Sequence, residues 1–263
     1  MGLTVIQKDS KLCLSEHMED YPDGIIIVLD KPYKWTSADA VRKVKFALQK
    51  HFHNHKLKVG HAGTLDPLAT GILLICIGKA TKLAESLQSE RKEYIAKIVL
   101  GATTPSFDRE HPIDKNFPYK HITLDKIKEA VAGMIGEQDQ VPPSFSAKFV
   151  DGVRAYDIAR GGDDIVLKPS RITVYSAEVL DAKGLDGVNF SVPENLPEIS
   201  LKISCSKGTY IRSIARDLGV SLGSGGFLSG LTRTASGGYI LDNAISVEQF
   251  EQIAGINRDK LQI

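Results

Sequence analysis

Cysteine is scarce in this chain: 263 residues contain three, Cys13, Cys76 and Cys205, far apart in the sequence. An odd number without a CxxC pair argues against a disulfide framework and against a cysteine-based zinc site. Long apolar runs are also lacking, since the longest, 25–29 and 72–77, are far too short to span a bilayer. The first residues show no signal-peptide pattern. We therefore expect a cytoplasmic protein with no membrane association.

Nucleotide-binding and metal-binding motifs are absent as well. The glycine-rich stretch 223–226 is accompanied by no Walker lysine and no Rossmann pattern. His51, His53 and His55 alternate near the end of an expected helix, but no cysteine or acid stands nearby. Solvated histidines explain this spacing better than metal ligands do. The sequence therefore predicts no metal, no nucleotide cofactor and no other cofactor.

Charge is balanced overall but unevenly distributed. The formal net charge is +1, yet the segment from Lys31 to Lys58 holds eight Lys/Arg against one acid, Asp39. The segment from Lys202 to Arg216 holds four bases and no acid. Local basic segments suit a protein that lays one face on phosphate, although a solvated basic helix face explains the same pattern.

Apolar periodicity predicts an α+β fold. Strands are expected at 25–29, 72–77, 94–100, 146–150, 172–180 and 199–204, and helices at 36–52, 81–88, 124–135 and from Tyr210 to a C-cap at Gly219. Strands do not alternate regularly with long helices, so we expect a mixed, mainly antiparallel central β-sheet flanked by helices. Residues 1–23 are expected to form a loosely specified lead-in, and residues 24–263 a single domain.

The segment Gly60-His61-Ala62-Gly63-Thr64-Leu65-Asp66-Pro67-Leu68-Ala69-Thr70-Gly71 is the strongest candidate site. A residue before proline is pushed out of the helical region, so Asp66 should lie on an extended or turning backbone. The surrounding glycines allow a bulky ligand to approach the chain closely. A lone Asp-Pro more often caps a turn, but the whole twelve-residue segment favours an exposed loop that carries a reactive carboxylate.

Six segments, in order, resemble motifs of the bacterial tRNA pseudouridine-55 synthase family. Gly60 to Gly71 resembles its signature, in which the aspartate is catalytic. The others are Asp30-Lys31-Pro32 with Trp35-Thr36-Ser37, Lys92-Glu93-Tyr94, Val141-Pro142-Pro143-Ser144-Phe145-Ser146-Ala147, Cys205-Ser206-Lys207-Gly208-Thr209-Tyr210-Ile211-Arg212, and Leu231-Thr232-Arg233-Thr234. One such match would be weak, whereas six in order across residues 24–240 are highly specific.

The resemblance assigns roles to individual residues. Asp66 would be the catalytic carboxylate and Arg212 the guanidinium that keeps it ionised. Tyr94 would stack on the target base, Tyr210 and Leu231 would confine the uracil, and His61 would meet the RNA beside the flipped nucleotide. Lys31 and the basic helix would bind backbone phosphates. Taken alone, Tyr94, Tyr210 and Leu231 also fit core packing, His61 a turn, and Arg212 a phosphate contact or a solvated helix charge.

The sequence departs from the family pattern at two points. Typical members continue into a small C-terminal RNA-binding domain, and we expect this chain to have no such separate domain. Thr232 stands where many members carry a second arginine, so one backbone contact is expected to be missing. Residues 24–263 would then form the pseudouridine synthase catalytic domain.

The implied reaction is the conversion of uridine 55 in the T loop of tRNA to pseudouridine, in which the N1–C1′ bond breaks and the uracil rejoins through C5. The stacked uridine must first be extruded from the loop. An ionised carboxylate could attack carbon or take a proton from the sugar, and burial of that carboxylate would require a partner cation. The tRNA T arm is the expected partner, an accessory tRNA-folding role is possible in principle, and a monomer is the default.

Two other functions compete with this interpretation. A nucleosidase or glycoside hydrolase would need a second carboxylate across the scissile bond, and no carboxylate of the motif segments fills that role. A non-catalytic tRNA-binding and folding module would not need Asp66, Tyr94 and Arg212 to be intact. Substitution of Asp66 by Asn separates the folding module from the synthase, because RNA folding should survive the change and pseudouridine formation should not.

Overall fold

The two apolar runs of the sequence form adjacent buried strands. A computed structural model describes residues 2–8, 10, 14–146, 148–150, 153–161 and 167–255. In it β2 (Ile25–Lys31) and β4 (Ala69–Ile77) pair antiparallel, from Ile25 opposite Ile77 to Lys31 opposite Gly71. Side chains on both faces of this pair are buried, which accounts for the unbroken apolar runs. Cys13 and Ala147, named above, lie outside the described residues.

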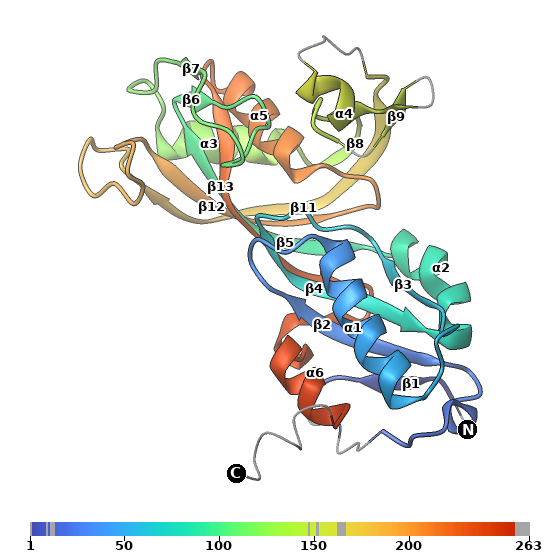
Figure 1. Cartoon of the computed structure of the whole chain (residues 1–263). Coiled ribbons are helices and arrows are strands. Elements are labelled where there is room, and N and C mark those ends of the chain that lie inside the picture. Colours follow the sequence, from blue (N-terminus) through green and yellow to red (C-terminus); the bar gives the residue numbers. More distant parts are fainter. Residues whose placement is uncertain are drawn as a thin grey trace. The chain divides into compact units, whose positions relative to one another are not determined.

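The chain divides into two units (Figure 1). Unit 1 comprises residues 1–92 and 232–263, and unit 2 comprises residues 93–231. The division falls within two strands, β5 (Lys92–Leu100) and β13 (Gly226–Ser236). The expectation of one domain over residues 24–263 stays a prediction.

In unit 1 the strand order is β1-β2-β4-β13, with β3 (Val59–Ala62) also paired to β4 and β14 (Tyr239–Ile240) to β13. β1 (Thr4–Ile6) pairs parallel to β2, so the N-terminal lead-in contributes a strand to the sheet. The other elements of this unit are η1 (Met18–Asp20), α1 (Ser37–His51), η2 (Gly78–Leu83), α2 (Ala84–Ser89), η3 (Leu241–Asn243) and α6 (Val247–Ile253).

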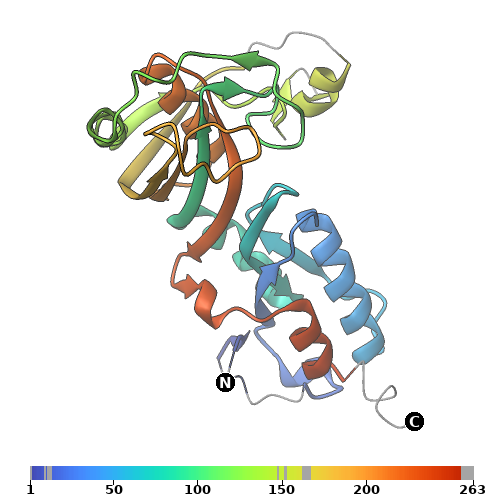
Figure 2. The same ribbon diagram turned by 90° about the vertical axis from the view of Figure 1, so that its left-hand side faces the viewer.

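Helix α1 follows the expectation closely. Thr36 is its N-cap, and a capping box forms because Thr36 Oγ1 accepts from Asp39 N (3.0 Å) and the Asp39 carboxylate accepts from Thr36 N (2.9 Å). Figures 1 and 2 show α1 beside α6, and an ion pair between Lys43 and Glu251 (2.5 Å) joins the two helices.

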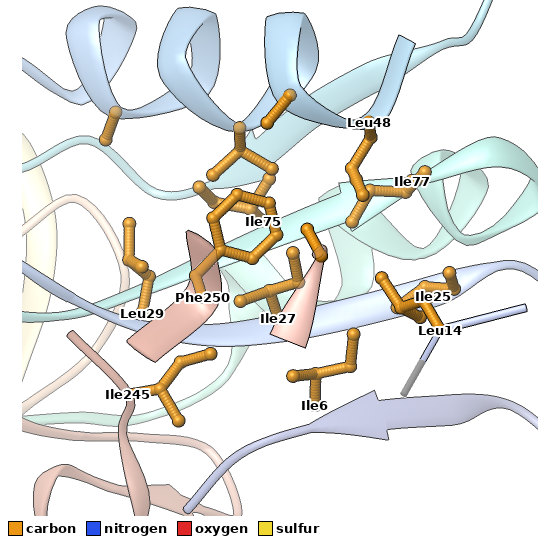
Figure 3. Packing of buried hydrophobic residues seen from close by; sticks show 14 of the residues in the cluster. Ile6, Leu14, Ile25, Ile27, Leu29, Leu48, Ile75, Ile77, Ile245 and Phe250 are labelled. Carbon is orange, nitrogen blue, oxygen red and sulfur yellow. The ribbon is translucent and has the colours of Figure 1, made fainter. Parts of the chain in front are cut away.

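The core of unit 1 lies between these helices and one face of the sheet. It combines Ile6 from β1, Ile27 from β2, Leu48 from α1, and Ile245 and Phe250 from the C-terminal region, all essentially inaccessible to solvent (Figure 3). The first and last segments of the chain are therefore part of one hydrophobic cluster. The opposite face of the sheet buries a second cluster, against which α2 packs.

In unit 2 the strand order is β13-β5-β12-β11-β8, and β11 pairs antiparallel with both β12 and β8. The remaining elements are β6 (Ala102–Thr103), β7 (Lys115–Asn116), α3 (Leu124–Gly133), β8 (Gly136–Gln140), β9 (Phe149–Val150), β10 (Val153–Arg154), α4 (Ala155–Arg160), β11 (Ser170–Lys183), β12 (Glu198–Cys205) and α5 (Ile211–Ser221). Helix α3 packs on β11 and contacts α5 (Figure 1). The mixed, mainly antiparallel sheet with flanking helices is confirmed.

The expected C-cap of α5 at Gly219 is wrong. The helix continues to Ser221, and Leu222 is its C-cap. A Cβ at Gly219 would lie 2.4 Å from Gly225 C and Gly226 N, so this glycine allows the backbone of β13 to approach the helix. Across the described residues, no helix is both long enough and apolar enough to traverse a lipid bilayer.

Substitution of Phe250 by Ala should lower the free energy of unfolding by about 3–5 kcal/mol, because it leaves a cavity in the core of unit 1. Phe46 provides a matched control: it lies on α1 with 74% of its surface exposed, and the same change there should cost less than about 0.5 kcal/mol. Urea denaturation monitored by circular dichroism measures both. Equal midpoints for the two variants would contradict the role of α6 in this core.

Candidate functional site

Asp66 lies in the loop between β3 and β4, and this loop is fastened to the segment that leads into α1. The buried hydroxyl of Ser37 accepts a hydrogen bond from Leu65 N (2.9 Å) and donates to Leu65 O (3.2 Å). On the other side of Asp66, Pro67 O accepts from Lys34 N (2.9 Å). Two motifs that the sequence analysis singled out separately are thus in contact, and the residues on both sides of Asp66 are held.

Lys31 is a second link between these segments. Its side chain is fully buried, and its ammonium donates to Pro32 O (2.9 Å), Trp35 O (2.6 Å) and Pro67 O (3.4 Å). An ammonium has three donors, and three carbonyls receive them. The phosphate contact expected for Lys31 does not fit this burial. The geometry instead assigns Lys31 to holding the Asp66 loop.

Lys31 also contributes charge beside Asp66. Burial lowers the pKa of Lys31 from its ordinary value of 10.5 to about 8, while the Asp66 carboxylate acts in the opposite direction and the Arg233 guanidinium adds to the lowering. Lys31 is therefore positively charged at neutral pH and interacts favourably with Asp66. Unit 1 by itself therefore places a cation within electrostatic reach of Asp66.

Arg233 joins the start of the loop to the sheet. It is 1% exposed, and it donates from Nε to Ile72 O (2.7 Å) and from its guanidinium to Gly63 O (3.2 Å). A Cβ at Gly71 would lie 2.3 Å from Arg233 O, so only glycine lets the two strands come this close. At the neighbouring position, Thr232 Oγ1 lies 3.0 Å from Thr70 Oγ1 and is hydrogen-bonded to it.

His61 lies on β3, opposite Ile75 of β4, and is half-buried. Burial, followed by the positive charge of Arg233, lowers the pKa of His61 below its ordinary value of 6.5. The ring is therefore neutral at pH 7, which suits a hydrogen-bonding or stacking contact rather than an ion pair with phosphate. The RNA contact expected for His61 stays a prediction.

The other candidate residues belong to unit 2. Tyr94 lies buried near the start of β5, Tyr210 is the N-cap residue of α5, Arg212 lies in the first turn of α5, and Leu231 is half-buried in β13. The structure thus brings Asp66, Lys31 and His61 together in one unit, and Tyr210 and Arg212 on one helix start in the other. The expected pairing of Arg212 with Asp66 stays a prediction.

Arg212 is held by groups of its own unit. Its side chain is 5% exposed and donates to Ser106 O (3.2 Å) and Phe145 O (2.9 Å), while Nε lies 3.8 Å from the carboxylate of Asp108. Asp108 in turn accepts from Ser106 Oγ (2.6 Å) and from Glu110 N (2.9 Å). These contacts fix the direction of the guanidinium.

Asp108 was missed by the sequence analysis. One signal was available: Asp108 follows a buried strand within a short loop that contains Pro105, as Asp66 follows a strand within its own loop. Sequence alone does not show that Asp108 is buried. Among the described residues, no group of three or more His, Cys, Asp or Glu side chains could hold a metal ion.

Substitution of Lys31 by Met should destabilise the protein by about 1–3 kcal/mol at about pH 7, because buried carbonyls lose their donor. The loss should be larger at about pH 10. Between about pH 8 and 10.5 the native Lys31 has lost its proton while the unfolded lysine keeps it, so the stability of the wild type rises with pH in this window. Met cannot titrate, so the variant does not gain this stability. Urea unfolding at both pH values measures the difference.

The exposed Lys45 of α1 provides the control, since Lys45→Met removes the same charge from a solvated position. It should change stability little at either pH. A loss for Lys31→Met that is identical at both pH values would contradict the lowered pKa of Lys31.

Comparisons with known proteins agree with this arrangement of motifs. Residues 49–211 match the family described as TruB family pseudouridylate synthase (N terminal domain). The chain is 48% identical over 233 residues to the tRNA pseudouridine synthase B of Phocaeicola vulgatus, which covers 89% of this chain and 94% of that protein. It is 46% identical over 235 residues to the protein of the same name from Flavobacterium johnsoniae, covering 89% and 97%.

Solved structures with lower identity share the fold. The chain resembles a protein in the crystal structure of a Cbf5-Nop10-Gar1 complex with a TM-score of 0.65 and 23% identity, over 97% of this chain but only 63% of that one. A structure of an H/ACA RNP bound to a substrate RNA containing 2′-deoxyuridine gives a TM-score of 0.62 and 23% identity, over 98% and 65%. The family match and the close relatives together show that this chain belongs to the TruB family of pseudouridylate synthases.

Proposed function

We propose that this enzyme isomerises uridine 55 in the T loop of tRNA to pseudouridine, and that Asp66 is its catalytic carboxylate. The observation that carries the proposal is the Asp66 loop, fastened on both sides by the segment from Lys31 to Ser37. The names of the relatives, tRNA pseudouridine synthase B, support tRNA as the substrate.

The chemistry requires a carboxylate that is ionised and fixed in direction. Isomerisation breaks the N1–C1′ bond and forms a C5–C1′ bond, with one proton lost from C5 and one gained at N1, so no atom is added or removed. Attack on the sugar carbon and removal of a sugar proton both need a charged Asp66. The positive charge of Lys31 lies within electrostatic reach of Asp66, and the hydrogen bonds to Leu65 and Pro67 limit the motion of the loop.

Unit 2 supplies the groups that would receive the flipped nucleotide. In the proposal Tyr94 stacks on the free base, Tyr210 and Leu231 confine the uracil, and Arg212 pairs with Asp66. The contacts that Arg212 makes with Ser106, Phe145 and Asp108 hold its guanidinium in one orientation, which a fixed ion pair requires. His61, neutral at pH 7, meets the RNA beside the flipped nucleotide.

The enzyme would act as a monomer in the cytoplasm, where folded tRNA is available. Exposed basic side chains of unit 1 would bind phosphates of the T arm, so the affinity for tRNA should weaken as the salt concentration rises. Lys45 and Lys50 are exposed on α1, whereas Lys43 is paired with Glu251. These two exposed lysines therefore replace Lys31 as candidates for the phosphate contact.

Incubation with an unmodified tRNA transcript should produce one new pseudouridine, at position 55. Carbodiimide treatment followed by primer extension maps it, because pseudouridine retains the reagent and stops the reverse transcriptase. A transcript with cytidine at position 55 provides the control and should give no stop. A stop outside the T loop would overturn the proposed position, and no stop at all would overturn the proposed reaction.

Substitution of Asp66 by Asn should lower the rate of pseudouridine formation by about 1,000-fold or more, because the amide cannot act on the sugar. The exposed Asp23 of the same unit is the matched control, and Asp23→Asn should keep the wild-type rate. Binding of the transcript, measured by filter retention, should survive in both variants. A rate for Asp66→Asn close to that of Asp23→Asn would exclude Asp66 as the catalytic residue.

A further inference from the structure

Gln140, the last residue of β8, takes no part in the proposed chemistry, yet its side chain is fixed in one orientation. It is 2% exposed, and both ends of its side-chain amide contact the same residue. Tyr210 N donates to Gln140 Oε1 (2.8 Å), and Gln140 Nε2 donates to Tyr210 O (3.2 Å). Donor and acceptor chemistry leaves one orientation of the amide, because the backbone N–H needs an acceptor and the carbonyl needs a donor. The side chain thus pairs with Tyr210 as a strand neighbour would.

Tyr210 occupies a position where the backbone needs such support. It is the N-cap of α5, with extended φ and ψ of −93° and 110°, and no side chain caps the helix there. Its carbonyl already accepts the first helical bond, from Ile214 N (3.1 Å). Without Gln140, the backbone N–H of Tyr210 would lose the acceptor that the structure gives it.

The residues after Gln140 continue the same pattern of contacts. Val141 O accepts from Ser213 Oγ (2.8 Å) and from the guanidinium of Arg216 (2.9 Å), and Phe145 O accepts from Arg212 (2.9 Å). The prolines between them, at positions 142 and 143, are buried and restrict the backbone of this segment. The segment 140–145, which we call the proline segment, therefore acts as a template for the first turn of α5.

We propose that Gln140 is a positioning residue that fixes the backbone of Tyr210, and through it places the Tyr210 ring and the Arg212 guanidinium for the reaction. The inference rests on the proposed function, in which these two side chains face the flipped nucleotide. Gln140 itself touches no reacting atom. Its effect should therefore fall on the rate of the bound complex more than on the binding of tRNA.

A protonated carboxylic acid can make the same two hydrogen bonds as the Gln140 amide, whereas an ionised carboxylate cannot. Protonated glutamic acid offers one acceptor and one donor on a planar group, as glutamine does. Ionised glutamate offers acceptors only, so one of its oxygens would face the carbonyl of Tyr210 and repel it. Burial and this repulsion both raise the pKa of a glutamate at position 140 above the ordinary value for Glu. The Gln140→Glu variant should therefore be impaired while the glutamate is ionised and should recover activity as the pH falls and the glutamate becomes protonated.

The test measures kcat and KM on the tRNA transcript between about pH 5 and about pH 8 for wild type, Gln140→Glu and Gln140→Leu. At the upper end Gln140→Glu should lose about 100-fold in kcat with little change in KM. The ratio of its kcat to that of wild type should rise as the pH falls. Gln140→Leu should be impaired at every pH, with a ratio to wild type that does not depend on pH.

Gln138→Glu is the matched control, because it adds the same charge on β8 and removes a donor to the carbonyl of Met134 (2.7 Å) rather than to that of Tyr210. It should keep wild-type kinetics across the range, and thermal unfolding of every variant at both ends shows whether the fold is intact. A Gln140→Glu ratio that does not change with pH would overturn the inference, as would wild-type kcat for Gln140→Leu. Neither of those outcomes contradicts the proposed function. A wild-type enzyme that forms no pseudouridine would overturn both the proposed function and the inference about Gln140.

Discussion

The buried ammonium of Lys31 is the interaction on which the Asp66 loop depends. Burial of a lone positive charge is unfavourable, and the structure offsets it with carbonyls from two segments of the chain, at Pro32 and Trp35 on one side and Pro67 on the other. One side chain thereby joins the entry to α1 to the loop between β3 and β4. The same charge lies within electrostatic reach of Asp66. A single group thus holds the loop and places a positive charge close to the carboxylate.

The two units hold candidate residues of different chemical kinds. Unit 1 holds the carboxylate on a loop fixed by backbone contacts, to which Ser37 and Arg233 are hydrogen-bonded as well as Lys31. Unit 2 holds the aromatic and guanidinium groups at the start of α5, where the proline segment accepts hydrogen bonds from Arg212 and Ser213. In both units the group with the proposed chemical role is fixed by buried polar side chains that bond to backbone. Such bonds specify direction, which hydrophobic packing alone does not.

The sequence predicts local structure well and side-chain partners poorly. The apolar periodicity of residues 36–52 predicts α1 almost to the residue, because this signal acts between neighbouring turns of one helix. The motif resemblance places Asp66, Tyr94 and Arg212 on the elements expected. The burial of Lys31, the partnership of Asp108 with Arg212 and the amide pair of Gln140 could not be predicted, since each joins residues far apart in sequence. Likewise, eight basic residues between Lys31 and Lys58 do not by themselves show which of the side chains is buried.

The hydrophobic cluster of unit 1 has a consequence for synthesis on the ribosome. Ile6 and Ile27 emerge before the whole of unit 2, but Ile245 and Phe250, which belong to the same cluster, emerge after it. Unit 2 lies wholly between them in the chain, so its strands and helices can pair while unit 1 is still missing an outer helix. The strands of unit 1 therefore keep part of this apolar face uncovered until α6 has been synthesised. In that interval a chaperone that shields apolar surface would protect the sheet of unit 1 on the face that α6 later covers.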